Sequence, residues 1–206
     1  MFISFEGIDF CGKSTQVELL KKYLVKQNKK VEVIREPGGT EISEQVRKIL
    51  LDKKNNQMFI ETEIFLFSAS RAQLVSQKIR PYLNEGIYVI SDRFSDSTTA
   101  YQGFGRGISL EAVKHINSLA IGETIPDLTF YIDIPVEIAE QRKKNKSKSE
   151  LDRIEVSDCN FFKRVREGYL MLAHTEKRFR IIDGTLPVDE IHKKIVEHLE
   201  LFEKEE

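Results

Sequence analysis

The chain has 206 residues, enough for one domain with a sizeable core, and we predict a single domain over residues 1–206. Its 32 Lys and Arg residues against 33 Asp and Glu residues give a net charge of -1, which argues against a general nucleic-acid binder. Two cysteines are too few for a disulfide framework. The first residues lack the regions of a signal peptide, and no apolar run approaches the roughly 20 residues that cross a bilayer. We therefore expect a cytoplasmic protein.

Short apolar runs alternate with longer segments of helical periodicity along the chain. We predict strands at 1–6, 31–35, 86–91, 128–134 and 180–183, and helices at 14–27, 41–51, 61–83, 110–120, 136–144, 159–178 and 188–202. This alternation predicts an α/β fold with a parallel sheet covered by helices on both faces. Functional residues are expected at the carboxyl ends of the strands, where such sheets bind their ligands.

The first predicted strand runs into a glycine-framed loop, GIDFCGKST, at residues 7–15. It fits the phosphate-binding pattern G-x-x-x-x-G-K-[ST], in which glycines let backbone N–H groups point at phosphate oxygens. Lys13 supplies a mobile positive charge, and the Ser14 hydroxyl is suited to ligate Mg²⁺. A strand before the motif and a helix after it predict that this loop binds a nucleoside triphosphate. The expected contacts are those of Gly7, Ile8, Asp9, Phe10, Cys11, Gly12, Lys13, Ser14 and Thr15.

An aspartate and an arginine follow the strand predicted at 86–91. Taken alone, Asp92 fits a turn or a helix cap better than a metal site. With a phosphate loop earlier in the chain, we interpret it as a residue that holds Mg²⁺ through water. The guanidinium of Arg93 is suited to binding a phosphate with two hydrogen bonds.

Five segments of the chain, in this order, resemble the thymidylate kinase family. They are FEGIDFCGKST (5–15), REPGGT (35–40), FLFSASRAQL (65–74), SDRFSDSTTAYQG (91–103) and LDRIE (151–155). The resemblance implies a phosphate-loop nucleoside-monophosphate-kinase fold with five parallel strands, helices on both faces and a mobile lid at about 142–155. It also implies transfer of the γ-phosphoryl group of ATP to dTMP, giving dTDP for dTTP synthesis, with Mg²⁺ and usually in a homodimer.

The resemblance implies a dTMP site on the segments after the second and third strands. Phe67 and Arg71 lie four residues apart on one helix face, although from the residues alone Phe67 fits the core better. In the family, the matching phenylalanine stacks on thymine, the matching arginine binds its edge, and the residue matching Arg93 grips the phosphate. Further implied contacts to dTMP come from Asp9, Glu36, Pro37, Thr98, Tyr101 and Gln102. Asp9 is also implied near the metal, but these positions fit turn, helix-surface or core roles as well.

Basic residues crowd the segment 142–153, RKKNKSKSELDR, between two predicted helices. Such a run is usually a solvated face, but an internal basic loop also fits the lid that the resemblance implies. A closing lid can neutralise charge on the moving phosphoryl group and exclude water. Some thymidylate kinases carry a catalytic arginine in the phosphate loop, whereas Phe10 matches the bacterial type, in which the lid supplies the charge. Here the lid positions where arginine is usual hold lysines.

The lid and the last strand complete the expected ATP site. The expected catalytic cations are Lys13, Arg93, Lys146, Lys148 and Arg153, with one of the two lid lysines at the γ-phosphate and Arg153 bridging phosphates. Arg142 is expected to stack on adenine, and Thr185 follows the last strand in a loop that resembles the one beside adenine. Asp152 and Glu155 are expected to orient these cations or the metal shell.

Other classes of protein remain open on the sequence. A kinase for a different nucleoside monophosphate would share the fold, but the set Phe67, Arg71, Thr98 and Tyr101 argues against it. A GTPase-like regulator is disfavoured because NKSK at 145–148 lacks the Asp of the guanine-reading N-K-x-D. A nucleic-acid patch on the lid is disfavoured by the near-neutral total charge.

Overall fold

The computed structural model of the chain describes residues 1–147 and 149–205, so the predicted catalytic residue Lys148 lies outside this part. Its centre is a five-stranded sheet in the order β2-β3-β1-β4-β5, with every neighbouring pair parallel. The strands are β1 (Phe2–Glu6), β2 (Val31–Arg35), β3 (Tyr88–Asp92), β4 (Leu128–Asp133) and β5 (Phe179–Asp183). The predicted α/β fold with a parallel sheet is therefore confirmed, and each strand lies within two residues of its predicted bounds.

The central strand explains how the sheet positions a site. All five residues of β1 are buried, as expected for a parallel strand covered on both faces. In the register of β1 with β3, Phe5 lies opposite Asp92, and in the register with β4, Phe5 lies opposite Phe130. The segments that follow β1 and β3 therefore leave the sheet side by side, at its carboxyl edge.

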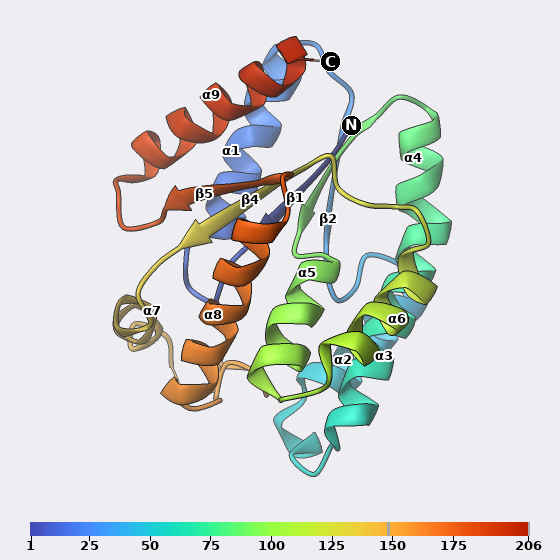
Figure 1. The fold of residues 1–206 in the computed structure, drawn as a ribbon, viewed down its shortest axis with the longest axis vertical. Helices are drawn as coiled ribbons and strands as arrows, with labels where there is room; N and C mark the ends of the chain where they lie inside the picture. Colours follow the sequence, from blue (N-terminus) through green and yellow to red (C-terminus); the bar gives the residue numbers. More distant parts are fainter. Residues whose placement is uncertain (148, 206) are drawn as a thin grey trace.

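Helices surround the sheet, with α1 and α9 above it and α5 and α8 below it in the view of Figure 1. They are α1 (Lys13–Lys26), α2 (Glu41–Leu51), α3 (Ile60–Leu74), α4 (Arg80–Asn84), α5 (Ser95–Thr98), α6 (Leu110–Ile121), α7 (Val136–Lys143), α8 (Cys159–Thr175) and α9 (Val188–Glu205). The segment predicted as one helix at 61–83 is α3 and α4 joined by a π-helical stretch, η2 (Val75–Ile79). Among the described residues, no helix is both long and apolar enough to cross a membrane.

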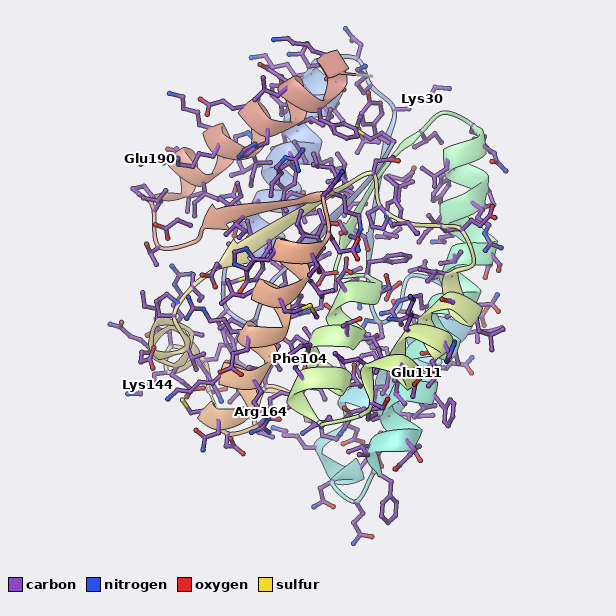
Figure 2. The ribbon with its side chains drawn as sticks, in the orientation of Figure 1. Lys30, Phe104, Glu111, Lys144, Arg164 and Glu190 are labelled. Atoms are coloured by element: carbon purple, nitrogen blue, oxygen red, sulfur yellow. The ribbon has the colours of Figure 1, made fainter. Side chains whose placement is uncertain are left out.

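A helical segment after β3 was not among the sequence predictions. A short 3₁₀ turn, η1 (Lys53–Asn55), was not predicted either. The helical segment after β3 comprises α5 and the π-helical stretch η3 (Thr99–Gly105). The sequence SDSTTAYQGFG is poor in strong helix formers, but the segment packs closely on α8. A Cβ atom at Gly105 would lie 2.6 Å from the Phe161 ring, and Arg164 donates hydrogen bonds to the Gly105 carbonyl. Figure 2 shows Arg164 close to Phe104 at this contact.

Candidate functional site

A cleft of about 490 Å³ opens at the carboxyl ends of β1, β2 and β3. Its walls come from the loops after these strands, from α3, from the segment 95–105 and from the segment 142–155. The structure brings together in this cleft the predicted residues Asp9, Phe10, Gly12, Lys13, Ser14, Thr15, Glu36, Pro37, Phe67, Arg71, Asp92, Arg93, Thr98, Tyr101, Gln102, Arg142 and Lys146. Asp152 and Glu155 line it as well.

The phosphate loop is shaped by backbone conformations that favour glycine. Gly7 has φ 144°, and a Cβ atom there would lie 2.6 Å from the Ile132 carbonyl oxygen, so no other residue fits. The ammonium of Lys13 donates to the carbonyl oxygens of Gly7 and Ile8, at 3.1 and 2.9 Å. Phe10, with φ 65°, is one of the non-glycine residues in the left-handed region. The loop thus forms a compact turn whose lysine is held over its own backbone.

Hard oxygen donors meet where the phosphate loop faces β3. The Ser14 hydroxyl donates to a carboxylate oxygen of Asp92 at 2.5 Å, a contact made by the register of β1 with β3. Hydroxyl and carboxylate oxygens suit Mg²⁺, which completes its octahedron with water and phosphate oxygens. Within residues 1–147 and 149–205, no group of three or more His, Cys, Asp or Glu side chains could hold a metal by itself. The donor set therefore fits Mg²⁺ bound jointly with a phosphate rather than a metal caged by protein.

Arg93 joins the phosphate loop to the segment after β3. Its guanidinium donates to Asp9 Oδ1 at 2.6 Å, to the Tyr101 hydroxyl at 2.9 Å and to the Gly7 carbonyl at 2.9 Å. Tyr101 donates to the second oxygen of Asp9 at 2.8 Å. Burial opposes ionisation of Asp9, but Arg93 and Lys13 outweigh it and hold its pKa below the usual value. Both Asp9 oxygens are thus engaged with this cluster rather than with the Ser14–Asp92 pair.

A buried ion pair forms the wall of the cleft near α3. Arg71 is 1% exposed and donates to Glu36 Oε2 at 2.7 Å and to the Thr98 hydroxyl at 2.7 Å. The other Glu36 oxygen, although buried, has no hydrogen-bond partner among the described residues. Phe67 is only partly buried and lines the cleft, so its ring is available to a ligand there.

The predicted lid contacts the phosphate loop from the side of β4 and β5. Arg142 donates to the Phe10 carbonyl at 3.1 Å and to the Gly184 carbonyl at 3.1 Å, bridging the two loops. The ammonium of Lys146 lies 5.1 Å from the centre of the Phe10 ring, a cation–π contact. Glu155 lies 3.7 Å from the same ammonium. Described residues between α7 and α8 form turns rather than helix or strand.

Comparison with known proteins identifies the family to which this chain belongs. A family model described as Thymidylate kinase matches residues 5–195. The chain belongs to the thymidylate kinase family. A thymidylate kinase of Kosmotoga olearia is 49% identical over 197 residues, 95% of this chain and 93% of that protein. One of Caldanaerobacter subterraneus subsp. tengcongensis is 50% identical over 204 residues, covering 98% of this chain and 96% of that protein.

A solved structure supports the same assignment. The crystal structure of thymidylate kinase from Ehrlichia chaffeensis matches with a TM-score of 0.78 and 34% sequence identity, covering 97% of this chain and 98% of that chain. The predicted nucleoside-monophosphate-kinase fold is confirmed by this match. Membership of the thymidylate kinase family also confirms the predicted enzyme class, a kinase that phosphorylates dTMP to dTDP with ATP as the donor.

Of the predicted site residues that the structure describes, five do not line the cleft of this thymidylate kinase family member. The side chains of Ile8 and Cys11 are buried behind the loop, and Gly7 offers its carbonyl to Lys13. Thr185 donates to Asp183 and does not reach the cleft.

The fifth, Arg153, turns away from the expected phosphates. Its guanidinium lies 2.6 Å from Glu63 Oε2 and donates to the Leu50 carbonyl at 2.7 Å. It lines a second cavity of about 330 Å³ instead. In this structure the guanidinium of Arg153 pairs with a buried carboxylate, and its bridging contact with ATP phosphates stays a prediction.

Sequence reasoning missed a buried carboxyl group beneath the cleft. Glu6, at the end of β1, accepts hydrogen bonds from the Phe94 amide at 2.7 Å, from the Ser97 hydroxyl at 2.7 Å and from the Tyr169 hydroxyl at 2.9 Å. Arg93 donates to the same two hydroxyls. Burial, with a smaller contribution from Asp96, raises the pKa of Glu6 to about 7. The available signal was a single charge at the end of an apolar strand.

Arg47 was missed as well. It lies on α2, lines the cleft and donates to the Pro37 carbonyl at 2.7 Å. Burial and the nearby charge of Arg35 lower its pKa. A basic residue on the helix that directly follows REPGGT was the signal in the sequence. Arg47 adds a further guanidinium to those of Arg35 and Arg93, which line the cleft on the side of β2 and β3.

Proposed function

We propose that the cleft binds ATP and dTMP together and transfers the γ-phosphoryl group between them. The observation that carries this proposal is the position of Arg93, which contacts the phosphate loop through Gly7 and Asp9 and the segment 95–105 through Tyr101. Phosphoryl transfer requires the acceptor oxygen to be aligned and the charge on the moving group to be neutralised. A guanidinium at the junction of two substrate sites can do both.

On the dTMP side, we assign the base to the space beside α3 and the phosphate to the arginines. The Phe67 ring would stack on thymine, while Arg71, Thr98 and Gln102 would bind the base edge with hydrogen bonds. Arg93 would hold the phosphate, and Tyr101 and Asp9 would contact the sugar. Glu36 and Pro37 would close over the acceptor, and the unpartnered buried oxygen of Glu36 supports a ligand contact there.

On the ATP side, the backbone N–H groups of the loop and the N-terminus of α1 would bind the phosphates. Lys13 would exchange the Gly7 and Ile8 carbonyls for phosphate oxygens. Arg142 would lie against adenine, and Lys146 and Lys148 would supply positive charge from the lid. Ser14 and Asp92 would hold Mg²⁺, which neutralises phosphate charge when bound.

The proposal also includes the oligomeric state of the enzyme and its location in the cell. The exposed apolar side chains Phe59 and Phe65, at 77% and 60% exposure, lie at or near the start of α3, and Leu119, at 89%, lies on the contacting helix α6. This apolar surface supports a homodimer formed through α3 and α6. We further assign the enzyme to the cytoplasm, as one domain over 1–206, with small-molecule substrates and no nucleic-acid or membrane partner.

A coupled assay that measures ADP formation tests the function. Turnover should be fastest with dTMP, lower with dUMP and much lower with UMP and AMP. Saturating turnover with AMP and none with dTMP would contradict the proposal. In a melting experiment, ATP should raise the melting temperature more than GTP, which also separates a kinase from a GTPase-like regulator.

A further inference from the structure

A second buried carboxylate, Glu63, stands behind the base end of the cleft. It lies in the first turn of α3 and is 1% exposed. Its Oε1 accepts hydrogen bonds from Gln102 at 2.9 Å and from Arg106 at 3.0 Å. Its Oε2 lies 2.6 Å from Arg153 and also accepts from Arg106 at 3.3 Å. One carboxylate thus connects α3, η3 and the predicted lid.

The charge state of Glu63 decides what Gln102 can present to the cleft. Burial opposes ionisation, but the hydrogen bonds and charge of Arg106, with smaller contributions from Gln102 and Arg153, hold the pKa of Glu63 below its usual value. An ionised carboxylate only accepts hydrogen bonds. Gln102 must therefore turn its NH₂ group toward Glu63, and its carbonyl oxygen away from it.

The carbonyl oxygen of Gln102 is the group left for a ligand. Gln102 lines the cleft, and within the part of the chain that the structure describes its Oε1 accepts no hydrogen bond. Arg106 and Arg153 hold Glu63 from two directions, so the carboxylate cannot rotate to release the amide. The cleft therefore offers an acceptor, not a donor, at this position.

We propose that Glu63 is a positioning residue that fixes the Gln102 carbonyl toward the nucleobase and thereby selects bases with a ring N–H at that edge. This inference rests on the proposed function, because it places the base of the acceptor nucleotide beside Gln102. Thymine and uracil carry an N3–H donor, whereas cytosine carries an acceptor lone pair at N3. A fixed carbonyl matches the first two and opposes the third. A freely rotating amide would accept all three.

The experiment measures dTMP phosphorylation by the full chain with dCMP or dUMP as competitor. In the Glu63→Gln variant, residue 63 can both donate and accept, so the amide of Gln102 is free to flip. The inhibition constant of dCMP relative to the KM of dTMP should fall about tenfold. The same ratio for dUMP should stay unchanged, because uracil and thymine share the N3–H. A general loss of structure would not move the two ratios differently.

The matched control is Glu61→Gln, which makes the same change in the same helical turn at an exposed position. Neither competitor ratio should change in this variant. A second comparison uses a Gln102→Ala background. If Glu63 acts through Gln102, adding Glu63→Gln to that background should leave the dCMP ratio where Gln102→Ala put it.

Three results would overturn the role of Glu63. The first is an unchanged ratio of the dCMP inhibition constant to the KM of dTMP in Glu63→Gln. The second is an equal change in the ratios for dCMP and dUMP. The third is the same effect of Glu63→Gln on the dCMP ratio in the wild-type and Gln102→Ala backgrounds. If circular dichroism shows that Glu63→Gln does not fold, Glu63→Asp decides, because the shorter carboxylate should loosen Gln102 and shift the dCMP ratio in the same direction. The wild-type chain is assayed first, since failure to phosphorylate dTMP would reject the proposed function and not this inference alone.

Discussion

Replacing Glu6 by Gln should stabilise the protein at alkaline pH and leave its stability near pH 4.5 almost unchanged. Glu6 is fully buried, and its pKa rises from an ordinary value of 4.5 to about 7 in the folded protein. Glutamine has the same shape and carries no charge at any pH. Its carbonyl can still accept from the Phe94 amide, and the Ser97 and Tyr169 hydroxyls can rotate to accept from its NH₂ group.

The magnitude follows from proton linkage. Between pH 4.5 and about 7, folded Glu6 keeps its proton while the unfolded chain releases it, so the free energy of unfolding falls as pH rises. Each pH unit in this window lowers the free energy of unfolding by about 1.4 kcal/mol, which amounts to about 3 kcal/mol in total. Glu6→Gln removes that loss. The variant should therefore exceed the wild type by up to about 3 kcal/mol at pH 8.

Urea denaturation of both proteins at pH 4.5, 6 and 8, followed by circular dichroism, measures this difference. Other titrating groups occur in both proteins and cancel when the two are subtracted. The advantage of the variant should grow between pH 4.5 and 7 and then level off. A difference that is the same at all three pH values would refute the claim that Glu6 titrates near 7, and a larger advantage at low pH would reverse its sign.

Three further predictions concern the cleft. Arg93→Ala should raise the KM for dTMP at least about 100-fold while the Kd of ATP, measured by calorimetry, changes little; equal dTMP affinity in mutant and wild type would remove Arg93 from the acceptor site. The double variant Lys146→Ala and Lys148→Ala should lower kcat more than it weakens ATP binding, about tenfold or more in steady-state assays. Unchanged turnover would move the catalytic charge to other residues. Asp92→Asn should raise the Mg²⁺ concentration that gives half-maximal rate by about tenfold, and an unaltered Mg²⁺ titration would argue against Asp92 as a metal-site residue.

Local sequence patterns were sufficient for the sheet and the phosphate loop. Strands such as Leu128–Asp133 are mostly apolar, and buried up to their last residue, because both faces are covered; a run of that kind is visible without tertiary information. The loop at 7–15 carries its own chemistry in consecutive residues. Phe67 is different, because the apolar cluster that it forms with Phe65 and Leu66 favoured the core, and the resemblance to a family directed it toward a ligand.

Residues whose roles depend on distant partners could not be found in this way. Glu6 receives a hydrogen bond from Tyr169, 163 positions further along the chain. Arg153 was expected at the phosphates because it belongs to a basic run, yet Glu63, from a different helix, binds it in this structure. The helical segment 95–105 owes its form to packing on α8 rather than to propensity. In each case, the interaction can be recognised only once the fold is known.

Because β1 is the central strand of the sheet, the two sides of the cleft are built on different strands and can change separately. Residues after β2 and β3 line one side of the cleft, residues of the segment 142–155 after β4 line the other, and the phosphate loop after β1 lies between them. Each side is anchored in its own strands, so a substitution on one side that leaves the contact of Arg153 with Glu63 intact need not disturb the other side. With dTMP and ATP placed as we propose, the choice of acceptor nucleotide can therefore change, or be engineered, while the residues that bind the donor nucleotide stay intact.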